Sequence, residues 1–262
     1  MTPIQARSLP LIIEGRDVIG QAKTGSGKTA AFGLGLLNKL NVKQFRVQSL
    51  ILCPTRELAD QVANDIRSLA RRIHNIKVLT LCGGVAFGPQ KGSLQHGAHI
   101  IVGTPGRIEE HLRKKNLKLN HLNTFILDEA DRMLDMGFLP DVKNIRSYIT
   151  QNTQTMLFSA TMPVEIQRLT TSFLKDPVKV EVSPPSSTVD KIDQRVLFVD
   201  RENKAALLAS MLKDVNIERA LIFARTKHGA NRIVRNLNKS KIKADAIHGN
   251  KSQSARLDAL NK

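Results

Sequence analysis

The sequence contains no tryptophan and a single tyrosine, Tyr148, beside nine phenylalanines. Several of the phenylalanines lie inside apolar runs, which is typical of core residues. Proteins that recognise unstacked bases need exposed aromatic rings on which those bases can stack. The scarcity of such rings indicates that any contact with nucleic acid is made mainly to the sugar-phosphate backbone, with weak sequence preference.

Cysteine and long apolar runs are also scarce. The two cysteines, Cys53 and Cys82, each end an apolar run and resemble small core residues, so they support neither a disulfide framework nor a metal site. The seven histidines lack metal-ligand spacing. No apolar run approaches the ~18 residues of a membrane span, and no signal peptide precedes the first motif. We therefore expect no membrane span and a location in the reducing cytoplasm.

Acidic residues are few compared with basic ones. There are 23 Asp and Glu against 40 Lys and Arg, which gives a net charge of +17. A charge of this size attracts polyanions, above all the phosphate backbone of a nucleic acid. The total alone favours such a partner only modestly over a merely basic soluble protein. The choice between these interpretations therefore depends on motifs.

Short apolar runs rich in Val, Ile and Leu alternate with longer helical patterns. Because the runs lack strict polar alternation, they are typical of strands in a parallel sheet that is covered on both faces. Strand–helix alternation implies right-handed crossovers and an α/β fold. The strands predicted for the first part of the chain are residues 17–21, 49–54, 77–82, 99–103, 124–128, 155–159 and 178–182.

Residues 183–190 interrupt this alternation. Pro184 and Pro185 favour an extended path, and the small polar residues around them have little to bury. We interpret the segment as a linker between a first domain, residues 1–182, and a second, residues 191–262. In the second domain we predict strands at 194–199, 220–224 and 244–248, and helices at 203–213, at 228–238 and from about 252.

A glycine-rich motif follows the first predicted strand and opens a helix, which makes it a P-loop with alanine where the first glycine often stands. Gly25 and Gly27 allow backbone N–H groups to turn inward around phosphates, and the helix N-terminus adds partial positive charge. We expect Lys28 to reach the β- and γ-phosphates and Thr29 to bind Mg²⁺. The predicted nucleotide-binding residues are Ala22, Lys23, Thr24, Gly25, Ser26, Gly27, Lys28 and Thr29.

A second apolar strand ends in the carboxylates of Asp128, Glu129 and Asp131. A P-loop protein needs an acid at the tip of a neighbouring strand to hold Mg²⁺, and Asp128 suits this role. Glu129 can orient or deprotonate the attacking water. Elsewhere such carboxylates usually form a solvated loop, but together with Lys28 and Thr29 they favour catalysis. We predict Lys28, Asp128 and Glu129 as catalytic residues, with Thr29 and Asp128 binding Mg²⁺ partly through water.

Residues 128–131 spell Asp-Glu-Ala-Asp, and further motifs accompany them in order: Pro-Thr-Arg-Glu-Leu-Ala at 54–59, Gly-Gly at 83–84, Thr-Pro-Gly-Arg at 104–107 and Ser-Ala-Thr at 159–161. With these motifs the chain resembles the DEAD-box ATP-dependent RNA helicases of superfamily 2, of bacterial type. Its first half is most similar to the DbpA branch and its second half to the RhlE branch. The resemblance implies a RecA-like ATP-binding domain followed by an incomplete second RecA-like domain.

The resemblance also implies roles for single residues. Gln5 is similar to the family's Q motif and would pair with the adenine edge, which selects ATP. Ser159 and Thr161 would bond Asp131 and couple the ATP site to domain closure, although they can equally cap the next helix. The implied contacts to the RNA backbone are Pro54, Thr55, Arg56, Gly83, Gly84, Thr104, Gly106, Arg107, Thr226, Gly249, Gln253 and Arg256.

Several of these contacts follow strand ends, where open α/β sheets bind ligands. Gly83 and Gly84 would let the backbone approach a phosphate closely. Arg56 and Arg107 can form bidentate contacts with phosphate. Taken singly, the glycines and prolines are also compatible with ordinary turns, and basic residues on a helix are often only solvated.

The family's activity implies an enzyme that couples ATP binding and hydrolysis to RNA clamping and local duplex unwinding. The family places an aromatic residue upstream of the Q motif, where it stacks on adenine, and a segment late in the second domain that supplies arginine fingers. Neither occurs in this sequence, so we expect the chain to be truncated at both ends. Such a finger changes the rate by about 10³–10⁵ in related P-loop systems, so we expect the chain by itself to turn over little ATP. The alternative is a non-catalytic module that binds ATP and RNA, and a DNA helicase or another P-loop ATPase is a third option.

Overall fold

The computed structural model describes residues 1–182, 193–214 and 217–260. The chain divides into two compact units, residues 1–187 and 188–262. The predicted linker at 183–190 lies outside the described residues.

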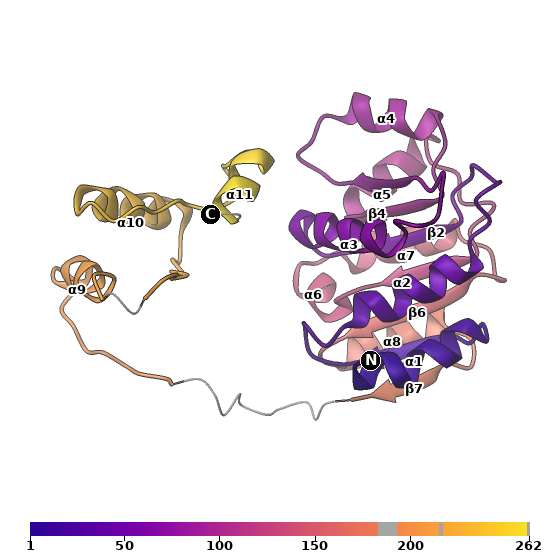
Figure 1. The fold of residues 1–262 in the computed structure, drawn as a ribbon, viewed down its shortest axis with the longest axis horizontal. Coiled ribbons are helices and arrows are strands. Elements are labelled where there is room, and N and C mark those ends of the chain that lie inside the picture. Colours follow the sequence, from indigo (N-terminus) through magenta and orange to yellow (C-terminus); the bar gives the residue numbers. More distant parts are fainter. Residues whose placement is uncertain (183–192, 215–216, 261–262) are drawn as a thin grey trace. The chain divides into compact units, whose positions relative to one another are not determined.

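The first unit is built around a seven-stranded sheet with the strand order β3-β4-β2-β5-β6-β1-β7 (Figure 1). All neighbouring strands pair in parallel. Each of the seven strands predicted for this part of the chain is present within two residues of its expected bounds, which confirms the parallel α/β sheet. The strands are β1 (Val18–Gln21), β2 (Ser49–Leu52), β3 (Val78–Leu81), β4 (Ile100–Gly103), β5 (Thr124–Leu127), β6 (Gln154–Ser159) and β7 (Val178–Glu181).

Helices cover both faces of this sheet (Figure 1). The helices of the first unit are α1 (Pro3–Ile13), α2 (Lys28–Lys39), α3 (Arg56–Leu69), α4 (Phe87–Gln95), α5 (Pro105–Arg113), α6 (Ala130–Asp135), α7 (Leu139–Ser147) and α8 (Val164–Phe173). Two apolar clusters form the core, one joining the sheet to α1, α2 and α3 and the other joining it to α5, α6, α7 and α8. Successive residues of a strand enter opposite clusters, as Leu50 and Ile51 do, which explains the unbroken apolar runs.

The parallel arrangement decides where the motifs lie. Because parallel strands connected by crossovers all point the same way, their carboxyl ends open at one edge of the sheet. Strand β6 pairs with both β1 and β5, so the loops that follow β1 and β5 are two strands apart at this edge. The loops after β2, β3 and β4 follow along the same edge.

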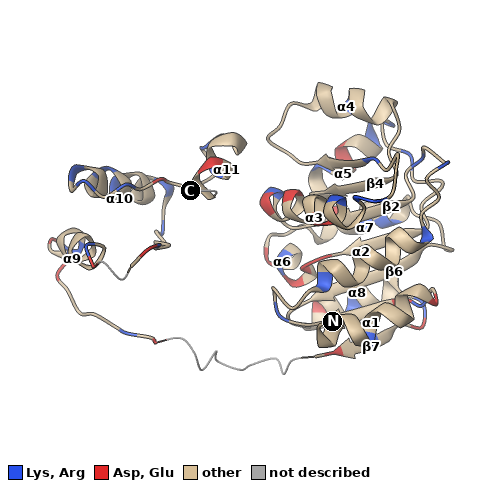
Figure 2. Cartoon of the chain, viewed as in Figure 1, with Lys and Arg blue, Asp and Glu red and all other residues tan. Residues whose placement is uncertain are grey.

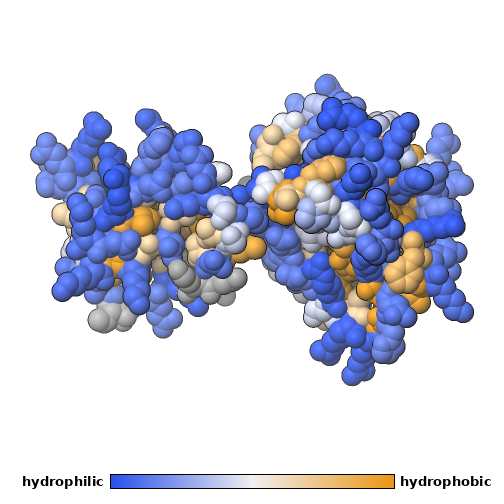
Figure 3. Space-filling view, turned by 90° about the horizontal axis from the view of Figure 1, so that it is seen from above, coloured by the Kyte–Doolittle hydropathy of each residue, from blue (hydrophilic) through white to orange (hydrophobic). Residues whose placement is uncertain are grey.

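The second unit is helical in its described part, with α9 (Lys204–Met211), α10 (Lys227–Lys239) and α11 (Gln253–Leu260). These helices were predicted. The three strands predicted at 194–199, 220–224 and 244–248 are wrong, because none of these described residues forms a strand. An isolated apolar run forms a stable strand only where neighbouring strands pair with its backbone and other elements cover its side chains. Here Phe198 is 96% exposed and Phe223 is 88% exposed, and apolar side chains reach the surface of the unit (Figure 3).

None of the helices in the described part of the chain has the length and apolar character that crossing a bilayer requires.

Candidate nucleotide-binding site

The P-loop connects β1 to the N-terminus of α2, whose first residue is Lys28. Gly25 and Gly27 adopt positive φ angles of 79° and 93°, a region that glycine enters without strain. A Cβ at Gly27 would also lie 2.5 Å from Nε2 of Gln5. The first N–H groups of α2 have no partner within the helix, and at the end of this loop they form a site suited to phosphate.

Lys28 is buried and reaches back across the loop. Its ammonium donates to the carbonyl oxygens of Ala22 at 2.8 Å and Lys23 at 2.9 Å. Burial lowers the pKa of Lys28, while the nearby carboxylates, Asp128 first, favour its charged form. The ammonium is therefore held inside the loop by two neutral oxygens, which phosphate oxygens can replace at no loss of hydrogen bonds.

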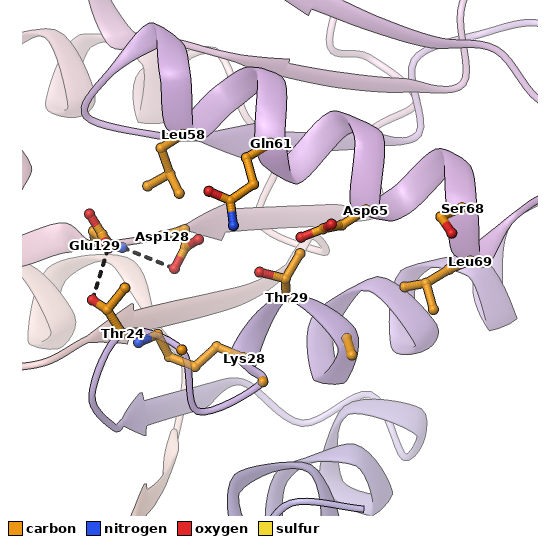
Figure 4. Close-up of a pocket in the computed structure, with 13 residues that line it drawn as sticks. Thr24, Lys28, Thr29, Leu58, Gln61, Asp65, Ser68, Leu69, Asp128 and Glu129 are labelled. Atoms are coloured by element: carbon orange, nitrogen blue, oxygen red, sulfur yellow. Dashed lines mark hydrogen bonds between the residues drawn. The ribbon is translucent and has the colours of Figure 1, made fainter. Parts of the chain in front are cut away.

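The P-loop and the acids after β5 line one cavity of about 380 Å³ (Figure 4). Its walls include Lys28, Thr29, Asp128 and Glu129. Asp128 is 3% exposed, and burial raises its pKa to about 7 even though Lys28 opposes the rise. The four residues that the sequence analysis assigned to phosphate, metal and water thus lie together, while their catalytic roles stay predictions.

Glu129 is held in place from two sides. Oγ1 of Thr24 donates to its Oε1 at 3.1 Å, and Nη1 of Arg132 lies 2.7 Å from its Oε2. The backbone of Glu129 adopts φ 54° and ψ 53°, which is left-handed and uncommon for a residue with a side chain. Such strain at the junction of a strand and a helix is typical of functional sites.

The site suits Mg²⁺ bound together with a nucleotide. In the described residues no group of three or more His, Cys, Asp or Glu could hold a metal by itself. Mg²⁺ prefers oxygen ligands and is usually held by one or two carboxylates plus substrate phosphates. Thr29 and Asp128 supply such oxygens, and a cation would offset the cost of burying the Asp128 carboxylate.

One wall of the cavity was missed by sequence reasoning. It is formed by α3, from which Gln61 and Asp65 point toward Thr29 and Asp128 (Figure 4). Burial raises the pKa of Asp65. The signal was present, because the polar residues at positions 61, 65 and 68 recur at helical spacing beside the apolar stripe.

Gln5 links α1 to the P-loop. Its Nε2 donates to the carbonyl oxygen of Gly27 at 3.1 Å, and its Oε1 accepts from the backbone N–H of Thr2 at 2.9 Å. The residue thus lies beside the loop, as the resemblance implied, and its pairing with adenine stays a prediction.

Asp131 connects the end of β6 to the acidic motif. Its Oδ2 accepts from both the backbone N–H and the hydroxyl of Thr161 at 2.9 Å, and its own N–H donates to Oγ of Ser159 at 3.2 Å. Burial acts to raise the pKa of Asp131, but hydrogen bonding from Thr161, from the Ser159 side chain and from the backbone of Arg132 outweighs it, and the pKa is lowered. The bonds expected from Ser159 and Thr161 are present, and their coupling role stays a prediction.

The residues predicted to contact RNA divide between the units. In the first unit Pro54, Thr55 and Arg56 follow β2, Gly83 and Gly84 follow β3, and Thr104, Gly106 and Arg107 follow β4. Thr55 also caps α3, because its Oγ1 accepts from the N–H of Leu58 at 3.2 Å. In the second unit lie Thr226, which caps α10, and Gly249, Gln253 and Arg256. Helix α10 carries Lys and Arg along its length (Figure 2).

The buried His111 of α5 should make the stability of the first unit depend on pH. Burial, aided by Arg107, lowers its pKa from 6.5 to about 4. As the pH falls, the unfolded chain therefore binds a proton at His111 before the folded chain does. The contribution of neutral His111 to the free energy of unfolding is complete above about pH 6.5 and is lost as the pH falls toward 4. Between pH 7 and pH 5 we therefore expect the wild type to lose about 2 kcal/mol of unfolding free energy relative to His111→Gln, measured by urea unfolding of both proteins at both pH values. The comparison between the two proteins is needed because the raised pKa of Asp128 changes the stability of both in the opposite direction over this range. An equal pH dependence in both proteins would refute the assignment.

A parallel sheet with a P-loop after one strand and a buried acid after a nearby one defines a P-loop nucleotide-binding protein. Residues 2–169 match the DEAD/DEAH box helicase family. The chain is 45% identical over 260 residues to the ATP-dependent RNA helicase DbpA of Escherichia coli K12, covering 99% of this chain and 57% of that protein. It is 43% identical over 261 residues to the DEAD-box ATP-dependent RNA helicase CshA of Geobacillus kaustophilus, covering 100% and 56%.

Solved structures agree with these relatives. A DEAD box protein from the hyperthermophile Methanococcus jannaschii matches with 37% identity and a TM-score of 0.66, over 99% of this chain and 70% of that one. Dbp5 of Saccharomyces cerevisiae, bound to RNA and ADP BeF3, matches with 29% identity and a TM-score of 0.88, over 99% and 66%. The chain belongs to the DEAD/DEAH box helicase family, and it spans a little over half the length of DbpA and CshA. The similarity of its second half to the RhlE branch stays a prediction.

Proposed function

We propose that this chain acts as a DEAD-box ATP-dependent RNA helicase, which binds and hydrolyses ATP while it clamps RNA and separates a short duplex locally. The observation that carries the proposal is the meeting of Lys28, Thr29, Asp128 and Glu129 in one cavity of about 380 Å³. Binding of RNA by the relative Dbp5 and the RNA-helicase names of DbpA and CshA support the choice of RNA.

The chain's own groups suit phosphoryl transfer. The backbone N–H groups of the P-loop cradle the phosphates, and Lys28 binds the β- and γ-phosphate oxygens. Thr29 and Asp128 would hold Mg²⁺, partly through water, and the bound ion would neutralise charge on the phosphates. Glu129, positioned by Thr24 and Arg132, orients the attacking water and accepts its proton.

The link from the ATP site to RNA runs through Asp131. The carboxylate of Asp131, two residues after Glu129, accepts from Thr161 in the segment after β6, and the backbone N–H of Asp131 donates to Oγ of Ser159 at the end of β6. We propose that changes at the phosphates reach that segment through these three hydrogen bonds. RNA would lie along the loops after β2, β3 and β4, held mainly by its backbone.

A non-catalytic module that binds ATP and RNA is the second candidate. The observation in its favour is the second unit, where Leu237 is the one buried hydrophobic residue among those described and no strand forms in that part. Such a unit would not supply a rigid partner for closure around the nucleotide. Binding would then persist without turnover.

Phosphate release from ATP–Mg²⁺ separates these candidates. We expect single-stranded RNA to stimulate release and a DNA strand of the same sequence not to do so. RNA affinity should fall steeply as salt rises, because neutralised phosphates release counterions. Tight ATP and RNA binding with no release would support the module, stimulation by DNA would support a DNA helicase, and an affinity independent of salt would contradict the backbone contacts.

A further inference from the structure

The loop after β3 is anchored by the helix that follows β4. Arg107, Glu110 and His111 of α5 and Lys114, which caps the end of that helix, follow one another at three- and four-residue steps, so these side chains share one face. Nη1 of Arg107 donates to the carbonyl oxygen of Val85 at 3.0 Å. Nε of Arg107 lies 3.1 Å from Oε2 of Glu110, whose other oxygen accepts from Lys114 at 2.6 Å.

Phe87, the first residue of α4, lies within this set of charges. Its ring stacks on His111 with 4.3 Å between centroids and 12° between planes. Nζ of Lys114 lies 4.1 Å from the centre of the ring, and Cζ of Arg107 lies 5.5 Å from it. Cations at such distances are attracted to the face of an aromatic ring, so Phe87 fixes the start of α4 against α5.

The buried Gln90 links the start of the loop after β3 to His111 on α5. Its Nε2 donates to the carbonyl oxygen of Cys82 at 2.9 Å, and its Oε1 lies 3.2 Å from Nε2 of His111. His111 is fully buried and Gln90 is 7% exposed. Burial keeps the pKa of His111 at about 4, so the ring is neutral at pH 7 and adds no third positive charge beside Arg107 and Lys114.

Gly83 and Gly84 lie between these anchors. The preceding carbonyl, of Cys82, is held by Gln90, and the following one, of Val85, is held by Arg107. Gly84 has a φ of 72°, and a Cβ there would overlap the guanidinium of Arg56. A Cβ at Gly83 would lie 3.7 Å from Nη2 of the same arginine. The two glycines and Arg56 therefore form one surface, whose shape depends on the anchors.

The guanidinium of Arg107 is already engaged by several neighbouring groups. Its side chain is only 10% exposed, and its guanidinium is divided among Glu110, Val85 and the ring of Phe87. A bidentate phosphate contact needs two free, parallel N–H groups. A bidentate contact through Nε would break the ion pair with Glu110, and one through Nη1 and Nη2 would compete with the carbonyl of Val85 for Nη1.

We propose that Arg107 is a positioning residue, which with Glu110 and Phe87 holds the Gly83–Gly84 loop in the shape that receives an RNA phosphate, and that Arg56 makes the direct phosphate contact there. This inference rests on the proposed function, because it assigns tasks within the same RNA-binding edge. It replaces the expectation that Arg56 and Arg107 both bind phosphate.

The salt dependence of RNA binding distinguishes the two arginines. Affinity of the full chain for a fluorescent single-stranded RNA is measured by anisotropy over a series of salt concentrations. Losing one direct phosphate contact reduces the slope of log affinity against log salt by about 0.7. We expect this reduction for Arg56→Gln, and for Arg107→Gln about tenfold weaker binding with an unchanged slope. A reduced slope for Arg107→Gln would overturn the proposal.

Glu110→Ala should change RNA affinity in opposite directions, depending on whether Arg107 binds phosphate directly or positions the loop. If Arg107 bound phosphate directly, removing Glu110 would release the arginine, remove a negative charge and tighten RNA binding. If Arg107 positions the loop, the same change loosens the anchor and weakens RNA binding several-fold. Tighter binding would therefore also overturn the proposal. ATP affinity, measured with a fluorescent analogue, should stay unchanged in Arg107→Gln and Glu110→Ala, which would show that the first unit is folded in both variants.

Amide hydrogen exchange tests the loop without RNA. We expect faster exchange at residues 83–86 in Arg107→Gln and Glu110→Ala than in the wild type, and unchanged exchange there in Arg56→Gln. Unchanged exchange in the first two variants would overturn the positioning role. Because this measurement needs no RNA, it stands apart from the proposed function, which fails if the wild-type chain binds no RNA at low salt.

Discussion

Replacing Lys28 with alanine should weaken binding of ATP–Mg²⁺ by about 100-fold or more. Lys28 is the buried cation of the P-loop, and hydrogen bonds to a charged group contribute about 1.5–3 kcal/mol each when they are made. Its loss removes the contacts to the β- and γ-phosphates together with a positive charge inside the cavity. Titration with a fluorescent ATP analogue, with and without Mg²⁺, measures the effect.

Lys39→Ala is the matched control for this change. Lys39 ends the same helix, α2, and its Nζ donates to Oε1 of Gln154 at 2.6 Å, with no part in lining the nucleotide cavity. The control removes one positive charge from the same helix, so a general electrostatic effect would appear in both variants. Unchanged nucleotide affinity in Lys28→Ala, with a melting temperature near that of the wild type, would refute the P-loop assignment.

Glu129→Gln should abolish RNA-stimulated phosphate release while leaving nucleotide affinity within about threefold of the wild type. A general base contributes about 10²–10⁴ to the rate, and glutamine cannot accept the proton of the attacking water. The amide oxygen can still accept from Thr24, so the side chain keeps one of its two anchors. Phosphate release under single-turnover conditions, with the chain in excess over ATP and with saturating RNA, checks the prediction.

Arg132→Gln controls for the other anchor. Glu129→Gln also breaks the ion pair with Arg132, whose side chain is 57% exposed. Arg132→Gln breaks the same pair but keeps the carboxylate, so it should retain most of the turnover. If both variants lost activity equally, position rather than proton transfer would explain the effect. If Glu129→Gln retained full activity, Glu129 would not be the base.

The nucleotide site was largely predictable because its parts are local. A strand, a glycine-rich turn and a helix N-terminus are adjacent in sequence, so Gly25, Gly27 and Lys28 identify a phosphate site before any tertiary contact is known. Asp128 and Glu129 were found in the same way, from an apolar strand that ends in acids. Their meeting with Lys28 followed from the rule that parallel strands end at one edge.

The second unit was predicted less well. Residues 220–224 form an apolar run of the same kind as the strands of the first unit, yet no strand forms there. A local pattern expresses a preference for a buried strand, and the preference is realised only if neighbours pair with the strand and helices cover it. The helices were predicted correctly, because their backbone hydrogen bonds are satisfied within the segment itself.

By itself the sequence determined the seven strands of the first unit, its P-loop and its acidic motif, since each depends on residues close together in the chain. Only the tertiary structure decided the partners that come from elsewhere. Gln61 and Asp65 line the cavity because α3 packs beside α2, and Arg107 is occupied because α5 lies against the loop after β3. Strand order brings these segments together, and no local pattern encodes strand order.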